Sequence, residues 1–93
     1  MEQELARIMT SIIQFIAKAV ESYGEPCYVT YNNFYLKHLG LSGLYGRRVS
    51  VKDGRVILGD DENGVGDISD DLEYLCVIAE ALANPANISH ESD

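Results

Sequence analysis

The sequence predicts a single α+β domain, with two longer helices packed on a small antiparallel sheet that contains a β-hairpin. Three observations lead to this fold class. Apolar residues recur at helical spacing near both ends of the chain, over residues 3–23 and 70–83. Between these segments, Asp53-Gly54 separates two runs rich in β-branched residues. The chain has 93 residues, of which 46% are apolar, and this suits one domain with a modest core.

The first helix, over residues 3–23, carries an apolar arc of roughly 160°, wider than the usual stripe of about 100°. This width predicts contact with two other elements, and the second of them could belong to another copy of the chain. A symmetric homodimer through paired first helices would use one patch twice. Gly24 and Pro26 are expected to end this helix. The expected dimer interface comprises Ile8, Ile12, Phe15 and Ala19, and the other edge of the arc, around Ile13 and Val20, is the alternative.

A short strand and a short helix are expected next. Cys27–Tyr31 alternates and is rich in residues that favour strands. Asn32 suits the N-terminal cap of a helix over residues 33–39, which Gly40 would close. The segment 41–46 contains two glycines and is expected to be a loop.

The hairpin over residues 47–58 has a register that the sequence alone can define. A two-residue Asp53-Gly54 turn of type I′ requires positive φ at both residues. That turn pairs Lys52 with Arg55, and it sorts the remaining side chains onto two faces. Because a slip of one residue would exchange the faces, the clean sorting favours this register. The apolar face holds Val49, Val51, Val56 and Leu58, and the other holds Arg48, Ser50, Lys52, Arg55 and, as the one exception, Ile57.

The last third is expected to form an acidic loop over residues 59–66 and then a helix over 70–83, capped by Asp67 or Ser69. The loop matches a calcium-binding EF-hand poorly, because Gly59 stands where the first carboxylate ligand is needed. We therefore expect a solvated turn, no metal and no cofactor. The domain is expected to span residues 1–87, followed by a flexible acidic tail over 88–93. The expected apolar face of the last helix comprises Leu72, Leu75, Cys76, Ala79, Leu82 and Ala83.

Charge is distributed unevenly, and this asymmetry is the strongest functional clue in the sequence. The net charge is −8. Residues 26–59 nevertheless hold five Lys or Arg residues and one Asp, whereas residues 60–93 hold ten acidic residues and no Lys or Arg. A basic middle and an acidic end can neutralise each other within one chain or between neighbouring copies.

Catalysis has little support in the sequence. The two histidines are His38 and His90, and Cys27 with His38 could form a thiolate pair only if the fold brought them together. Two cysteines, Cys27 and Cys76, are too few for a disulfide framework, so we expect two buried thiols, with one bridge as the alternative. We therefore expect no enzymatic activity and no small-molecule substrate. The absence of an apolar run of membrane-spanning length and of a basic, signal-like start favours a cytoplasmic protein without membrane contact.

The segment Tyr35-Leu-Lys-His-Leu-Gly-Leu-Ser42 resembles the helix and turn of helix-turn-helix proteins. With the hairpin as a wing, residues 31–58 resemble a winged-helix regulator, and this resemblance implies nucleic-acid binding. The recognition helix would fall on Gly43–Arg48, which holds two glycines and overlaps the hairpin. The residues that would contact a nucleic acid or another partner are Lys37, Tyr45, Arg47, Arg48, Lys52 and Arg55.

Two classes of function remain on this basis. The first is a small protein-interaction or regulatory module that self-associates as a homodimer. The second is a nucleic-acid-binding regulator that uses the basic segment 35–55. The strongly negative net charge of the chain opposes binding to a nucleic acid.

Overall fold

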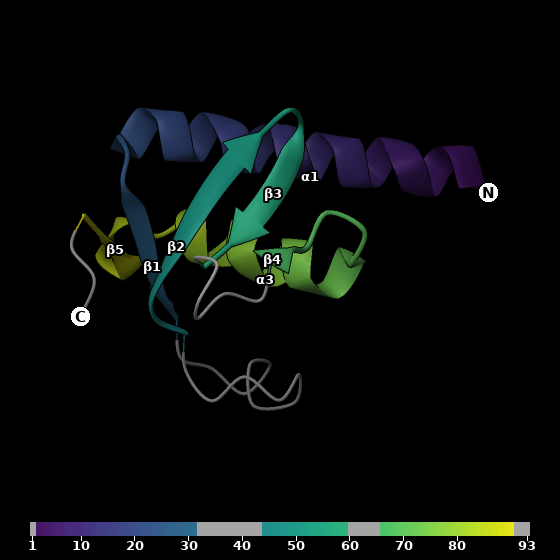
Figure 1. Cartoon of the computed structure of the whole chain (residues 1–93). Helices are drawn as coiled ribbons and strands as arrows, with labels where there is room; N and C mark the ends of the chain where they lie inside the picture. The colour runs from purple at the N-terminus through teal and green to yellow at the C-terminus, as the bar shows by residue number, and fades with distance from the viewer. Residues whose placement is uncertain (1, 32–43, 60–65, 91–93) are drawn as a thin grey trace.

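The computed structural model describes residues 2–31, 44–59 and 66–90, and it confirms the α+β class. Two helices lie side by side on one face of a five-stranded antiparallel sheet, and no helix within the described ranges lies on the other face, which we call the open face (Figure 1). The strand order is β4-β3-β2-β1-β5. The elements are α1 (Glu2–Tyr23), β1 (Cys27–Tyr31), β2 (Leu44–Lys52), β3 (Arg55–Leu58), β4 (Gly66–Asp67), α3 (Leu72–Leu82), the 3-10 turn η1 (Pro85–Asn87) and β5 (Ile88–Ser89).

The β2–β3 hairpin has the predicted register. Lys52 pairs with Arg55 and Val51 pairs with Val56 across the two-residue turn. Asp53 and Gly54 have φ values of 53° and 73°, as a type I′ turn requires. Because side chains alternate along a strand, this register turns the valines toward the helices and the cations toward the open face of the sheet.

The core lies between the sheet and the two helices. Val49, Val56 and Leu58 of the hairpin are fully buried. The helices cover them with Ile16 of α1 and Leu75 of α3, both also fully buried. Burial of each such side chain stabilises the fold by about 1.5–3 kcal/mol relative to exposure. The other residues of this core are Val20, Cys27, Val29, Ile68, Tyr74, Val77, Ile78, Ala81 and Leu82.

Helix α1 matches the predicted range closely and contacts both the sheet and α3, as its wide apolar arc predicted. Gly24 ends it with a φ of 90°, and the Gly24 amide donates to the Val20 carbonyl at 3.0 Å. The Tyr23 hydroxyl donates to the carbonyl of Leu82 at 2.7 Å and so links the ends of α1 and α3.

Helix α3 differs from the prediction in its start and in its buried face. Asp71, rather than Asp67 or Ser69, is the N-terminal cap, because its Oδ1 accepts the Tyr74 amide at 3.1 Å. Cys76 and Ala83 are exposed, and Leu72 and Ala79 are only half-buried. All residues of α3 except Glu73 and Glu80 are apolar, so the sequence does not define which face packs on the sheet. The buried residues are Tyr74, Leu75, Val77, Ile78, Ala81 and Leu82.

Two short strands were not predicted. Gly66–Asp67 forms β4 beside β3, and Ile88–Ser89 forms β5 beside β1. The expectation of a flexible tail is therefore wrong for residues 88–89, and the ring Nδ1 of His90 lies 2.9 Å from the carbonyl oxygen of Pro26. Strands of two residues are too short to show an alternating pattern, which is why the sequence did not predict them. Residues 91–93 lie outside the described residues.

Both cysteines are free thiols. Cys27 is buried in β1, as expected, whereas Cys76 is exposed on α3, so the alternative of a bridge between them is wrong. The expected helix over 33–39, with Lys37 and His38, lies outside the described residues, as do positions 60–65 of the acidic loop.

Candidate functional site: the outer helix surface and the open sheet face

An apolar stripe runs along α1 at the edge of the core. Leu5, Ile8 and Phe15 are 46%, 52% and 45% exposed, and Ile12 and Ala19 of the same stripe are half-buried. These are the residues of the expected dimer interface, extended by Leu5. The alternative edge around Ile13 and Val20 packs against the core, and the half-buried Ile12 and Ala19 also contact it. The N-terminal part of α1, which is exposed from Glu2 to Ile8, extends beyond the sheet (Figure 1).

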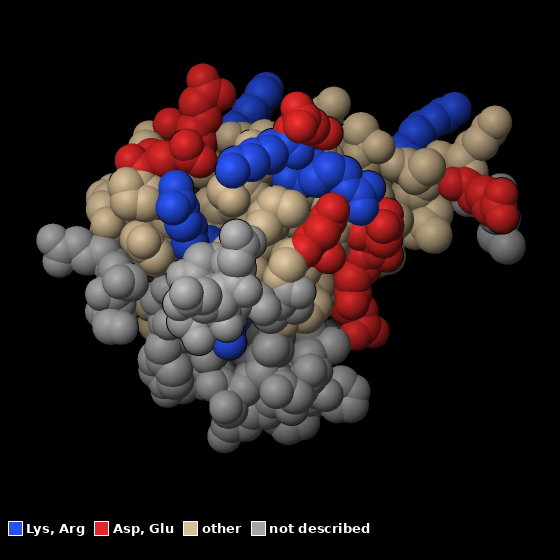
Figure 2. All heavy atoms as spheres, viewed as in Figure 1, with Lys and Arg blue, Asp and Glu red and all other residues tan. Residues whose placement is uncertain are grey.

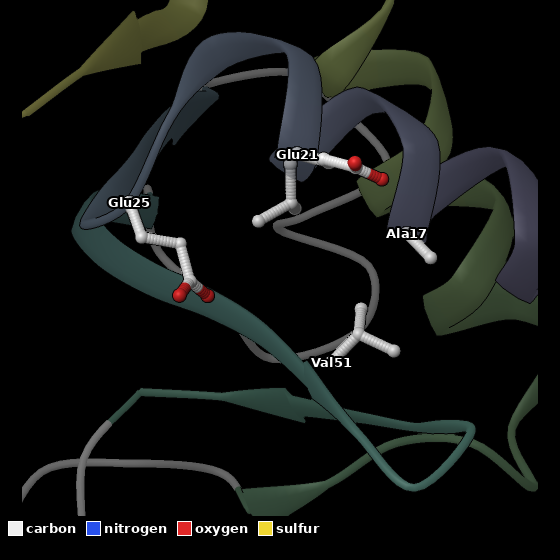
Figure 3. A pocket seen from close by; sticks show the side chains of 5 residues that line it. Ala17, Glu21, Glu25 and Val51 are labelled. Carbon is white, nitrogen blue, oxygen red and sulfur yellow. The ribbon is translucent and has the colours of Figure 1, made fainter.

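The direction of this stripe follows from the residues on the opposite side of α1. Ala17 and Val20 of α1 line a shallow cleft with Val51 of the hairpin, so this side of the helix faces the sheet (Figure 3). At about 100° per residue, Ile8 and Phe15 point about 160–180° away from Ala17. The stripe therefore faces away from the hairpin.

A second apolar stripe lies on α3. It comprises Leu72, Cys76, Ala79 and Ala83, four of the residues that the sequence assigned to the buried face. Cys76 lies about 160° around the helix from the fully buried Ile78, so it points away from the sheet. Because α1 and α3 lie side by side, the two stripes share the outer side of the helix pair. We call these residues, with Leu5, Ile8, Ile12, Phe15 and Ala19 of α1, the outer helix surface. Its half-buried members Ile12, Ala19 and Ala79 also pack against the core.

The open sheet face carries the basic residues of the hairpin. Arg48 and Lys52 are exposed there, and Arg48 pairs with Tyr28 of the neighbouring strand. Figure 2 shows Lys and Arg side chains as a band over the hairpin, with Asp and Glu on its flanks. The predicted shared face of Arg48, Lys52 and Arg55 is thus confirmed by the register.

Arg47 does not belong to this band, although the sequence placed it at the base of the same patch. It pairs with the buried Val29, so alternation turns it toward the helix side of the sheet. Burial raises the pKa of the Tyr74 hydroxyl on α3, and the charge of Arg47 opposes that rise. Arg47 is therefore part of the environment of α3 rather than of the open face.

Arg55 is neutralised by the acidic turn that precedes α3. Its Nε lies 2.8 Å from Asp67 Oδ2, and its Nη2 lies 3.0 Å from Asp70 Oδ2. Hydrogen bonds from Ser69 and Arg55 lower the pKa of Asp67 to about 2. Part of the positive charge of the hairpin is thus neutralised by acidic residues of the same chain.

The described features that bear on catalysis and metal binding are the cleft beside α1, the acidic side chains and Cys27. The cleft of Figure 3 is lined by Ala17, Val20 and Val51, with the Glu21 and Glu25 carboxylates beside them, and its lining residues include no Ser, Thr, Cys, His or Lys. No group of three or more His, Cys, Asp or Glu side chains in the described ranges could hold a metal ion. Burial raises the pKa of the Cys27 thiol, which opposes the thiolate form that a pair with His38 would need.

The winged-helix resemblance does not hold at the recognition helix, the element that would contact DNA. The segment Gly43–Arg48 was to provide the recognition helix, but Leu44–Lys52 forms β2. Tyr45 is therefore a strand residue, and its side chain, like Lys37, lies outside the described part. The outer stripe of α3 is the candidate feature that the sequence missed, because its residues were assigned to the core.

Among residues 2–31, 44–59 and 66–90, neither helix combines the length and the apolar character needed to cross a bilayer. Comparisons with protein-family models, with curated proteins and with solved structures find no match to this chain.

Proposed function

We propose that this protein is a small, non-enzymatic interaction module that self-associates through the outer helix surface. The observation that carries this proposal is the exposure of Leu5, Ile8 and Phe15, each near one half, along a single stripe of α1. Isolated exposed apolar residues are common, but a continuous stripe of large ones marks an interaction surface. Removal of apolar surface from water stabilises an association by about 25 cal/mol per Å².

The architecture supports the same proposal. A sheet covered by helices on one face leaves the outer side of the helices to face water, so that side is normally polar. Here both helices carry apolar residues on it, from Leu5 to Ala19 and from Leu72 to Ala83. A second helix layer packed on this side would give the order sheet, helices, helices, sheet.

The proposal of a non-enzymatic role is supported by how the described carboxylates are used. Asp67 and Asp70 bind Arg55, and Asp71 caps α3, so three of the acidic groups near the hairpin have structural partners. A cytoplasmic location is part of the same proposal.

The test compares two lysine substitutions on the same helix. Ile8→Lys places a charge in the stripe, whereas Thr10→Lys places it on an exposed position about 160° around α1. Light scattering at matched concentrations should give a dimer mass for the wild type and for Thr10→Lys, and a monomer mass for Ile8→Lys. Equal masses for the two variants would contradict the assignment of the stripe.

Nucleic-acid binding is the second candidate, because Arg48 and Lys52 lie exposed on an open face beside Tyr28. Cations next to an aromatic ring suit a single strand, whose phosphates and bases they would contact. The net charge of −8 and the pairing of Arg55 with Asp67 oppose it. Fluorescence anisotropy with a labelled single-stranded oligonucleotide at low salt tests it: binding abolished by Arg48→Glu with Lys52→Glu, but not by Arg7→Glu, would favour this function.

A further inference from the structure

We infer that the occupant of the outer helix surface is a second copy of this chain whose α1 runs antiparallel, with Glu4 of each copy beside Lys18 of the other. This inference rests on the proposed self-association and adds its direction and register. It starts from the spacing of the exposed stripe. Leu5, Ile8, Ile12, Phe15 and Ala19 follow one another at alternating intervals of three and four residues.

That spacing is the one by which two helices pack along a common seam. An average of 3.5 residues keeps a narrow stripe facing a partner helix, whereas the core of a monomer is normally lined by a broader face. On α1 the two faces adjoin. Ile16 and Val20 are buried in the monomer core, and Ile8 and Phe15 are exposed. Ile12 and Ala19 lie between them and pack partly against the core. A helix of a second copy would cover the exposed Leu5, Ile8 and Phe15, with the half-buried Ile12 and Ala19 at the base of this seam.

Two opposite charges flank the seam on one side. Glu4 directly precedes Leu5, and Lys18 follows Phe15 by three residues, so both occupy the same position relative to the seam. They are about 21 Å apart along the helix and cannot reach each other within one copy. Both side chains are exposed, and neither forms an ion pair or hydrogen bond with another described residue.

The positions of these charges select the antiparallel arrangement. When Leu5 packs against Phe15 of the second copy, Glu4 comes beside Lys18 of the second copy, and twofold symmetry repeats the pair. In a parallel pair, the flank with Glu4 and Lys18 would instead meet the opposite flank of the other helix. At the positions that Glu4 and Lys18 would meet, that flank holds Met9 and Tyr23, which carry no charge and pack against their own core. Of the two directions, only the antiparallel one places both Glu4 and Lys18 beside an opposite charge of the second copy.

Charge reversal tests the register. At low salt, Glu4→Lys should place two lysines together at each end of the seam and weaken dimerisation by roughly three- to thirtyfold, since exposed ion pairs contribute little individually. Lys18→Glu should weaken it similarly, and the double variant Glu4→Lys/Lys18→Glu should recover the wild-type dissociation constant. An equimolar mixture of the two single variants should form heterodimers in preference to either homodimer.

Two controls make the same change of charge on α1 at positions outside the flank of Glu4 and Lys18. Glu2→Lys reproduces the loss of an acidic residue from the first turn of α1, and Arg7→Glu reproduces the loss of a cation from its exposed side. If the controls weaken the dimer as much as the test variants do, or if the double variant is not rescued, the antiparallel register is wrong while self-association stands. A wild type that stays monomeric at every concentration would overturn both the register and the proposed function.

Discussion

The Nε of Arg55 in β3 lies 2.8 Å from Oδ2 of Asp67 in β4, so the basic hairpin is bound directly to the acidic turn before α3. The same turn is attached to the hairpin by the backbone, because the Ile68 amide donates to the Val56 carbonyl at 3.0 Å. The acidic third of the chain therefore contributes contacts that stabilise the fold, in addition to surface charge. Arg55 is exposed but ion-paired, which leaves Arg48 and Lys52 as the exposed hairpin cations without an ion pair to another described residue.

The Arg55–Asp67 contact predicts a specific pH dependence of stability. Folding lowers the pKa of Asp67 from 3.8 to about 2, so the stabilisation is fully present above about pH 4 and is lost as pH falls toward 2. Asp67→Asn should therefore be less stable than the wild type at pH 7, and the difference should shrink on acidification. Urea titrations of both proteins between pH 2 and 7 measure this. A difference that is constant over this range would show that Asp67 is not held as an anion by its neighbours.

Ser69 is predicted to be the most sensitive polar residue of the described chain. It is 3% exposed, and its Oγ accepts the Val56 amide at 2.7 Å. Ser69→Ala would leave that buried N–H without its partner, at a cost of about 1–3 kcal/mol. Chemical denaturation measures the loss, with the exposed Ser22→Ala on α1 as a control that should be nearly silent. Equal effects of the two substitutions would contradict the role of Ser69.

Gly54 is predicted to act through backbone conformation alone. It has a φ of 73°, and a Cβ added there would meet no atom within 4 Å. Gly54→Ala should cost on the order of 1 kcal/mol, because an L-residue with a side chain is strained in this region. Gly54→Asn should cost less, since asparagine tolerates positive φ. Thermal melts that rank asparagine below alanine would contradict a purely conformational effect.

The two cysteines are predicted to report on the outer helix surface. Cys76 is exposed and Cys27 is buried with a raised thiol pKa, so a thiol reagent should modify Cys76 quickly and Cys27 only on unfolding. As the protein concentration rises and the dimer forms, the Cys76 rate should fall. In Ile8→Lys it should remain fast throughout. If the Cys76 rate is unchanged as the wild type dimerises, the α3 stripe is not part of the interface.

The hairpin and α1 could be predicted because their patterns exclude alternatives. Asp53-Gly54 permits one turn geometry, and only one register sorts Val49, Val51 and Val56 from the cations. Even there, burial was not uniform: Val56 is fully buried, but Val51 borders the cleft beside α1 and is half-buried. The register follows from local pattern, whereas the depth of each position depends on what packs over it.

The rest depends on packing between segments far apart in the chain. Almost every residue of α3 is apolar, so only the sheet determines that Ile78 is buried and Cys76 is exposed. β4 pairs with the outer edge of β3 at Ile57, and β5 pairs with the outer edge of β1 at Tyr28. Both strands therefore depend on contacts between distant segments. Of the candidate site, the sequence offered Ile8 and Phe15 as one of two possible exposed edges of α1, and it did not predict the stripe of α3.

Sedimentation velocity of the wild-type protein, from micromolar to millimolar concentration and at low and high salt, tests the central claim most directly. Self-association through Leu5, Ile8 and Phe15 predicts a monomer–dimer equilibrium that persists at high salt, because screening weakens ion pairs and not apolar burial. The Glu4–Lys18 pairs predict only a modest weakening as salt rises. A single monomeric species at every concentration and both salt conditions would contradict the claim.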